Sequence, residues 1–478
     1  MPPGSLSGQS TGTDAGLGDP VTADRAALTA SYLDEVARRG GTADDLRAVM
    51  PTRGRLWAAY KKRWIPRPLF LGEAEADQVN SDLQHVKAAM ASLPGQLYDG
   101  DLAAFARAAG LAEVQADALM RVQPKQLTDW ARADMYPDPQ GLRLMEFNVG
   151  STIGGSECGE IARSMLRYPP LREFARAHRL GYVSAMPEQI RRTFEETGLD
   201  RADHPMIALV DTPAHYHTIG AYLHQVSRYW RGIGLDAHAC HIGQLKVRNG
   251  RVWLRGRPVD IIFRIFLLEH LLEPDGPEVV FPLLDAVARG QVAMFTPMDA
   301  DLYSSKAVLA MVSDHANRHL FTPAQQTAID RVLPWTRMLR PGPVTLEDGS
   351  TVDLAQYAFS HPQDLVLKPA LLHGGIGVLP GWDSYTTEGV WREALKDAMG
   401  GPYVLQRRIE VIPELAPGED GKPFGWETTW GFFTSPDGFG GVWARAFPAQ
   451  QGHGVARAGS GLLISGALVQ RPEAPAQA

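Results

Sequence analysis

The sequence predicts a mixed α/β fold of the α+β kind, because the spacing of its apolar residues changes twice along the chain. From residue 23 to residue 129 apolar residues recur at helical spacing. At Trp130 the spacing becomes two, as in strands, and from residue 206 short apolar strands alternate with helices. With 478 residues, 44% of them hydrophobic, the chain has apolar material for about two to four domains.

Charge and composition exclude several classes of protein. Lysine and arginine number 47 against 54 acidic residues, a net charge of −7 with no basic stripe, so nucleic acid is not expected as a partner. The longest apolar run, Val259–Leu272, contains charged residues, so no membrane span is expected. The N-terminus has no signal-peptide pattern, and two cysteines cannot build a disulfide framework. The sequence therefore predicts a cytoplasmic protein.

The N-terminal region is expected to be a tail followed by helices. Residues 1–22 are rich in Gly, Ser, Thr and Pro, which is typical of a disordered tail. Helical spacing over 23–39 ends at Gly40-Gly41, and Thr42–Asp45 has the pattern of a capping box that opens a short helix. Further amphipathic helices are expected over 75–93, 101–109 and 113–122.

The rest of the chain divides at changes in this pattern. Residues 130–136 and 142–149 flank a turn rich in Pro and Gly and predict a β-hairpin, which a helix over 157–167 follows. A second α/β stretch has expected strands at 206–210, 259–263 and 291–295 and helices at 218–231 and 279–289. A third has an expected helix at 304–312 and strands at 364–368, 403–409 and 441–447, before a tail over 469–478.

The hairpin carries a candidate metal site. Arg132, Asp134, Glu146 and Asn148 all have even numbers, so each pair shares one face of its strand. A turn centred near Gln140 places Asp134 opposite Glu146 and Arg132 opposite Asn148. Opposed carboxylates repel each other unless a cation lies between them, and carboxylate and amide oxygens suit Mg²⁺ that also holds a phosphate. The alternative is a solvated face on which charges merely cluster.

A glycine-rich loop carries a candidate phosphate site. An expected strand ends at Lys368, and Gly374, Gly375 and Gly377 follow it. Such glycines let backbone N–H groups approach phosphate oxygens, and a lysine neutralises them. A plain hairpin turn is the alternative. Lys306, another of the nine lysines, stands at an expected helix start, where alone it would be a solvated residue.

Two later segments give weaker signals. The strand Tyr403–Ile409 offers backbone groups that could pair with an adenine edge, although by itself the segment favours a simple sheet strand. Arg445 ends a strand just before the glycine-rich run 452–466, where an arginine can clamp a phosphate or a developing oxyanion.

Other features favour plain structural explanations. His215–His217 and His238–His241 have metal-like spacings, but no second cluster completes a zinc site. Cys158 has no histidine partner in a motif, so a buried thiol is expected there. Three tryptophans are expected to pack in a core: Trp426, Trp430 and Trp443.

Taken in order, these segments resemble the circularly permuted branch of the ATP-grasp superfamily, which includes glutathionylspermidine synthetase and eukaryotic glutathione synthetase. The resemblance runs from residue 130 to 463, about two-thirds of the chain, and the step from Asp134 to Glu146 resembles the metal-ligand spacing of that branch. The matching segments are Arg132–Asp134, Met145–Asn148, Gly154-Gly155, Val259–Arg264 with Glu269, Leu284–Gly290, Ser305–Ala307, Val366–Pro369, Gly374–Gly377, Tyr403–Gln406 and Arg445.

The resemblance implies an ATP-grasp fold in permuted order, with ATP between two antiparallel sheets. It assigns 130–200 to the metal-binding hairpin and following helices, 201–303 to a pre-ATP-grasp-like α/β domain and 304–468 to nucleotide-binding lobes. The helical N-terminal region, 23–129, is expected from its spacing alone and lies outside the resemblance. In it, Mg²⁺ is held by Asp134, Glu146 and Asn148. The groups nearest the nucleotide are Lys306, Lys368, Gly374, Gly375, Gly377, Gln406, Arg407 and Ile409. Arg132 and Arg445 face the transferred phosphate and the tetrahedral intermediate.

The activity that the resemblance implies is ATP-dependent amide bond formation. A small-molecule carboxylate would become an acyl phosphate, and an amine would then displace the phosphate. Two departures stand out: Arg407-Arg408 occupies a place where many relatives carry an acid, and the amidase domain of some relatives is absent. Two alternatives remain open: a nucleotide-binding protein without turnover and an ATP-grasp phosphotransferase. The sequence indicates neither the acid and amine nor the oligomeric state.

Overall fold

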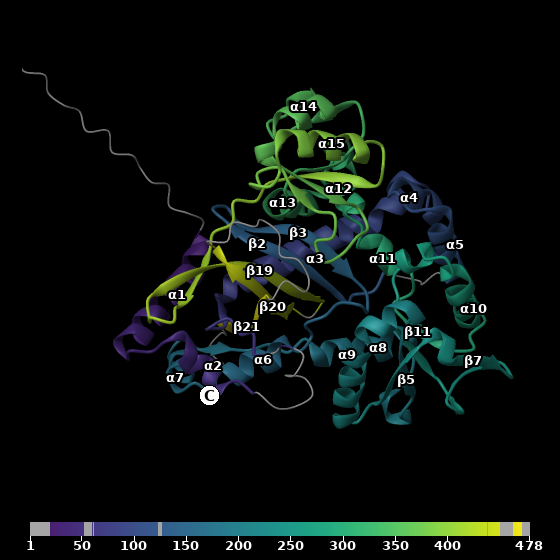
Figure 1. Cartoon of the computed structure of the whole chain (residues 1–478), viewed down its shortest axis with the longest axis horizontal. Helices are drawn as coiled ribbons and strands as arrows, with labels where there is room; N and C mark the ends of the chain where they lie inside the picture. The colour runs from purple at the N-terminus through teal and green to yellow at the C-terminus, as the bar shows by residue number, and fades with distance from the viewer. Residues whose placement is uncertain are drawn as a thin grey trace, which may run out of the picture.

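The computed structural model describes residues 20–51, 60, 62–122, 127–436, 438–449 and 462–470 (Figure 1). Residues 1–19 and 471–478 of the expected tails and residues 452–461 of the glycine-rich run lie outside the described residues. None of the helices that are described is long and apolar enough to cross a membrane.

The central element is an eight-stranded sheet built from three distant parts of the chain. Its main path runs β1 (Leu69–Leu71), β21 (Leu463–Gln470), β20 (Gly438–Pro448), β19 (Pro423–Ser435), β2 (Ala131–Asp138) and β3 (Gly141–Val149). Two short strands flank this path: β18 (Glu414–Pro417) pairs with β19, and β4 (Leu180–Gly181) pairs with β21. The expected hairpin is confirmed, since Asp134 pairs with Glu146 and Arg132 pairs with Asn148.

The two faces of this sheet meet different surroundings because side chains alternate along a strand. On β20, Val442, Ala444 and Ala446 are buried in the largest core cluster, together with residues of α3 (Glu73–Leu97). Trp443 and Arg445 point to the opposite face, on the side where α6 (Cys158–Met165) packs. One face is therefore core, and the other is free to carry polar side chains.

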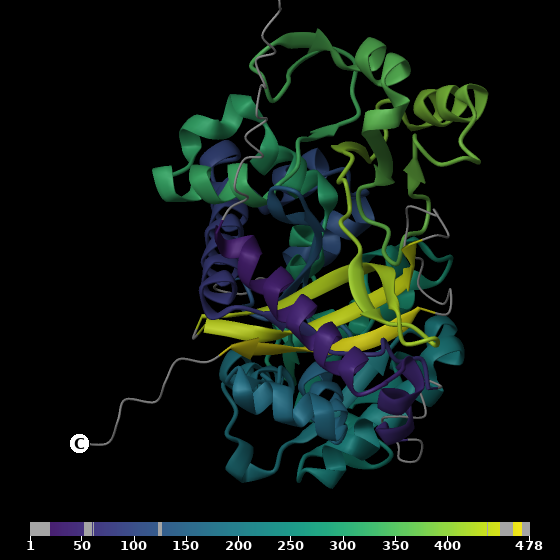
Figure 2. The same cartoon turned by 90° about the vertical axis from the view of Figure 1, so that its left-hand side faces the viewer.

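The N-terminal helices pack around this sheet. Figure 2 shows α1 (Pro20–Arg38) running across it, and α1 packs against β1 and β18. The capping box at Thr42 is confirmed, because the backbone N–H of Thr42 donates to Asp45 Oδ2 at 2.7 Å at the start of α2 (Ala43–Val49). The remaining helices of this part are α4 (Leu102–Ala108), α5 (Glu113–Arg121) and α7 (Pro169–Ala177).

A four-stranded parallel sheet forms a second layer, as the sequence predicts. Its order is β11 (Ala293–Phe295), β10 (Ile261–Arg264), β5 (Met206–Asp211) and β6 (Asp236–His241). Its helices are α8 (Met186–Thr197), α9 (Pro213–Gly232), α10 (Gly276–Ala288) and α11 (Asp299–Tyr303), and a small sheet of β7 (Leu245–Arg248), β8 (Arg251–Leu254) and β9 (Arg257–Pro258) lies beside it.

A third lobe stands over the central sheet (Figure 1). Its antiparallel sheet has the order β12 (Thr336–Met338), β17 (Tyr403–Arg407), β15 (Leu365–Pro369) and β16 (Leu379–Pro380). Two helices, α14 (Leu354–Ser360) and α15 (Glu388–Ala398), pack on this sheet in a separate core cluster. The lobe also contains α12 (Lys306–Ser313), α13 (Pro323–Val332) and the hairpin of β13 (Pro343–Thr345) and β14 (Thr351–Asp353).

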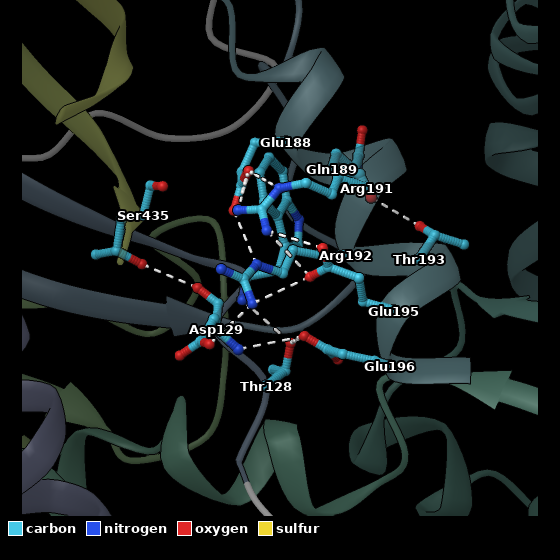
Figure 3. Close-up of polar contacts among 12 residues, drawn as sticks. Thr128, Asp129, Glu188, Gln189, Arg191, Arg192, Thr193, Glu195, Glu196 and Ser435 are labelled. Carbon is cyan, nitrogen blue, oxygen red and sulfur yellow. Dashed lines mark hydrogen bonds and ion pairs between the residues drawn. The ribbon is translucent and has the colours of Figure 1, made fainter. Parts of the chain in front are cut away.

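A polar cluster fixes the start of β2 against two helices (Figure 3). Asp129, two residues before β2, forms an ion pair with Lys87 of α3 and accepts a hydrogen bond from Nη1 of Arg192, on α8, at 3.1 Å. Glu196 of α8 accepts from the hydroxyl of Thr128 at 2.8 Å. The cluster therefore ties the strand that carries Asp134 to both layers.

We expect Arg192→Ala to lower the free energy of unfolding by about 1–2 kcal/mol, because it leaves the half-buried Asp129 with one cation fewer. Arg191→Ala is the matched control, since Arg191 is more exposed and its ion pairs lie within α8, where such pairs are worth about 0.5 kcal/mol or less. Denaturant unfolding of both variants measures the difference, and equal losses would contradict the anchoring function of Arg192.

Candidate functional site

A cavity of 690 Å³ lies between the eight-stranded sheet and the sheet of the third lobe. Its walls contain side chains from β2, β3, β19 and β20 on one side and from β15, β17 and the loop after β15 on the other. Most of the residues that the sequence singles out line it: Arg132, Glu146, Asn148, Lys306, Lys368, Gly374, Gly375, Gln406, Arg407, Ile409 and Arg445. Asp134 lies beneath this wall, and Gly377 lies in the loop beside it.

The carboxylate of Asp134 is the most deeply buried charged group of the site, with 0% exposure. Arg132 donates to it twice, from Nε to Oδ1 at 2.8 Å and from Nη2 to Oδ2 at 3.0 Å. Nη2 of Arg445 lies 2.6 Å from Oδ2, and Nδ2 of Asn148 donates to the same oxygen at 3.2 Å. Asp134 therefore fixes both arginines.

Glu146 faces several cations. Nζ of Lys306 lies 3.4 Å from Oε2, and Nδ2 of Asn148 donates to Oε1 at 3.4 Å. Burial raises the pKa of Glu146, but the nearby charges of Lys306, His373, Arg445 and Lys368 outweigh it and hold that pKa well below its usual range. The opposed carboxylates of the hairpin are thus neutralised by the protein's own basic groups.

Lys368 ends β15 inside the cavity wall. Its Nζ donates to Oε1 of Gln406 at 2.6 Å and to the carbonyl of Met145 at 3.5 Å. Burial and the charge of Lys306 lower the pKa of Lys368 to about 7, against the opposing effect of Glu146. The ammonium group therefore lacks a full counter-charge.

Lys306 joins the start of α12 to the loop after β15. Its backbone N–H donates to Ala370 at 2.8 Å and its Nζ donates to the carbonyl of Leu372 at 3.0 Å. Gly374, Gly375 and Gly377 all have positive φ, between 65° and 77°, a conformation that side chains with a Cβ rarely adopt. The loop connects the antiparallel strands β15 and β16, as the hairpin-turn alternative expects, and it lines the cavity; its binding of phosphate stays a prediction.

The strand β17 uses its side chains within the third lobe. The amide of Gln406 donates to the hydroxyl of Thr336 at 3.1 Å while it accepts from Lys368. The guanidinium of Arg407 binds Glu347 through two hydrogen bonds, at 2.7 and 2.8 Å. Arg407, which directly follows this glutamine, therefore has a carboxylate partner of its own within the lobe.

Sequence reasoning missed part of the cavity wall. Trp426 and Trp430 are buried, as expected, and Trp443 is half-buried: it packs against two core clusters, as expected, and it also lines the cavity, which the sequence did not predict. Tyr60, Thr152 and Tyr222 also line it, from three segments far apart in the chain. No short motif marks such residues, because only the folded chain brings them together.

A second polar cluster joins Asp211, His215 and His270, whose polar atoms all lie within 4.8 Å of one another. Nδ1 of His215 is 2.8 Å from Oδ2 of Asp211, and Nδ1 of His270 accepts the N–H of Leu267 at 3.0 Å. A neutral His270 then carries its proton on Nε2, which makes that nitrogen a donor and not a metal ligand. Cys158 is buried, as expected, and burial raises the pKa of its thiol to about 12.

Comparison with known proteins supports the fold. No protein-family model matches the sequence, and no curated protein matches it. A glutathione synthetase-like effector from Globodera pallida is similar in structure, with a TM-score of 0.53 and 12% identity over 93% of this chain and 98% of that one. The chain therefore shares the fold of a glutathione synthetase-like protein, in agreement with the resemblance of its motifs.

Two further solved structures are more distant. A putative gamma-glutamylcysteine synthetase from Methylobacillus flagellatus has a TM-score of 0.36 and 9% identity, over 79% of this chain and 86% of that one. D-alanyl-alanine synthetase A from Vibrio cholerae has a TM-score of 0.25 and 13% identity, over 48% of this chain and 67% of that one. Likenesses this weak carry no argument about the site.

We expect the stability of the protein to rise with pH between about 7 and 10 through Lys368. In this range the folded protein has lost the proton from Lys368, whereas the unfolded chain keeps it, so raising the pH favours folding by up to about 1.4 kcal/mol per pH unit. Lys368→Met should remove this slope, and Lys396→Met, on the exposed surface of α15, should keep it. Parallel unfolding free energies for the parent and Lys368→Met across this range would contradict the assignment.

Proposed function

We propose that the chain is an ATP-dependent carboxylate–amine ligase that forms an amide bond and releases ADP and phosphate. One observation carries the proposal: four basic side chains meet one buried and one partly buried carboxylate at the wall of a cavity between two antiparallel sheets. The basic groups are those of Arg132, Arg445, Lys306 and Lys368, and the carboxylates are those of Asp134 and Glu146. The excess positive charge favours an anionic ligand, and a polyphosphate supplies the matching charge.

The cavity offers distinct places for the parts of ATP. Lys306 and Lys368 would meet the phosphates, and the backbone of the loop around Gly374 and Gly375 would close over them. The segment from Gln406 to Ile409 would lie beside the adenine, with Arg407 held away by Glu347.

The residues around Glu146 fit Mg²⁺. A carboxylate accepts along about four lone-pair directions, and four donors already meet Asp134, one of them Nδ2 of Asn148. A half-turn of the Asn148 amide would bring its oxygen toward Glu146 and free one direction on Asp134. The side-chain oxygens of Asp134, Glu146 and Asn148 would then face one another, and a cation in place of the amide N–H would be needed to hold them together. Bound Mg²⁺ would supply charge neutralisation and hold phosphate oxygens.

The reaction itself would need no nucleophile from the protein. An oxygen of the substrate carboxylate attacks the γ-phosphorus of ATP, and ADP leaves. The amine nitrogen then attacks the acyl carbon, phosphate leaves, and the nitrogen loses a proton. Arg132 and Arg445 would neutralise the charge of the transferred phosphoryl group and of the oxyanion. Positioning and electrostatics would therefore supply most of the rate.

The proposal is tested by incubating the full chain with Mg·ATP and panels of small carboxylic acids and amines, with ADP release and product mass as readouts. We expect ADP release that needs both an acid and an amine, and a product whose mass is that of the two joined with loss of water. A phosphorylated product without amide would indicate a phosphotransferase. Nucleotide binding without ADP release for any pair would indicate a binding protein.

We expect Glu146→Gln to abolish most ADP release and to raise the Mg²⁺ concentration needed for the rest, because the variant loses a charged ligand. It should also lower the stability of the ligand-free protein, since Lys306 and Lys368 lose their counter-charge. ADP release against Mg²⁺ concentration and melting curves measure both effects. Glu388→Gln, at an exposed position of α15, is the control. Unchanged Mg²⁺ dependence in Glu146→Gln would remove Glu146 from the metal site.

A further inference from the structure

We propose that Trp443 is a positioning residue that holds the guanidinium groups of Arg132 and Arg445 against its ring. The inference rests on the proposed function and adds to it the contact that sets where the two guanidinium groups meet the terminal phosphate of ATP. Cζ of Arg132 lies over the Trp443 ring at 4.9 Å from the centroid, and Cζ of Arg445 lies over it at 4.8 Å. Both distances are within the range of attractive cation–π contacts.

The order of the strands brings this tryptophan to the arginines. Trp443 of β20 pairs with Gly431 of β19, and Gly431 pairs in turn with Asp134 of β2, so the three lie in one row across the sheet. A Cβ on Gly431 would lie 2.9 Å from Cδ and 3.0 Å from Nε of Arg132. The missing side chain of Gly431 is what lets Arg132 reach across β19 toward Trp443.

The Trp443 ring also packs against the loop that contains Gly154 and Gly155. Gly155 has a φ of +90°, and a Cβ there would lie 2.3 Å from the Trp443 ring, so the loop backbone packs directly on the indole. Nη1 of Arg132 donates to the carbonyl of the preceding residue, Gly154, at 2.7 Å. The Asp134 carboxylate and the Trp443 ring therefore both contact each arginine, and the carbonyl of Gly154 is a third contact for Arg132.

The indole N–H does not account for a tryptophan at this position. Nε1 of Trp443 is buried and has no hydrogen-bond partner among the residues that the structure describes. A buried unpaired donor is unfavourable, and a phenylalanine or leucine would fill space without it. The large π face against two guanidinium groups is what distinguishes tryptophan from these residues at this position.

The experiment isolates the contribution of the terminal phosphate. Calorimetry gives the dissociation constants of Mg·ADP and of the Mg²⁺ complex of the ATP analogue with NH between the β- and γ-phosphorus. Their ratio measures what the γ-phosphate adds. We expect Trp443→Leu to reduce this ratio about tenfold, with ADP affinity within about twofold of the parent, because only the arginine end of the cavity changes. Trp443→Phe, which keeps a π face, should recover most of it.

Two further variants separate positioning from packing. Gly431→Ala keeps the Trp443 side chain, but its Cβ would lie 2.8 Å from the Trp443 carbonyl oxygen and 2.9 Å from Cδ of Arg132, so it should reduce the same ratio and keep ADP affinity. A melting curve of this variant checks that β19 and β20 still pair. Trp253→Leu is the control, because Arg248 lies over Trp253 at 5.7 Å in a hairpin outside the cavity wall. It should leave both affinities unchanged.

The outcomes are distinct. If Trp443→Leu and Gly431→Ala keep the parent's ratio of dissociation constants, the positioning by Trp443 is overturned. It is also overturned if Trp443→Leu and Trp443→Phe reduce the ratio equally, because the effect would then come from the shape of the side chain. Should Trp443→Leu fail to fold by its melting curve, the comparison of Trp443→Phe and Gly431→Ala with the parent decides. A parent that binds neither nucleotide overturns the proposed function, and this inference with it.

Discussion

The ion pairs of Asp134 with Arg132 and Arg445 are the interaction on which the rest of the site depends. A fully buried carboxylate is costly unless its charge is compensated, and here two guanidinium groups from two strands compensate it. Because β19 lies between β2 and β20, the pair of Asp134 with Arg445 reaches across β19 at the point where the cavity begins. A different strand order would separate Arg445 from Asp134 and leave the buried carboxylate with one cation fewer. The ion pair therefore favours this strand order.

The basic side chains around Asp134 and Glu146 determine which ligands the cavity attracts. Arg132 and Arg445 form ion pairs with Asp134, whereas Lys306 and Lys368 share the charge of Glu146. Burial destabilises the ammonium form of Lys368. Anionic oxygens entering the cavity would relieve that imbalance, and a divalent cation would let Glu146 and a phosphate lie close together. The same electrostatic arrangement therefore supports both parts of the proposal, the nucleotide and the metal.

Local pattern predicted the hairpin and its facing pairs because alternation fixes the face of a strand and a short turn fixes the register, as the pairs Asp134 with Glu146 and Arg132 with Asn148 show. The same rule does not place Trp443 on the cavity wall, because its row on the sheet contains Gly431 of β19 and Asp134 of β2, about 10 and about 300 residues away in sequence. Alternation says that Trp443 and Arg445 share a face, but only the strand order says that this face is the cavity. Likewise, nothing local joins Asp211 to His270.

The most direct test of the account is calorimetric titration of ATP into the full chain, with and without Mg²⁺. The account predicts one ATP bound per chain, with affinity that rises when Mg²⁺ is present, because the cavity combines surplus basic groups with oxygen ligands for one ion. The absence of a binding heat at millimolar ATP, or binding of equal strength with and without Mg²⁺, would contradict the assignment of Asp134, Glu146 and the lysines to a nucleotide–metal site.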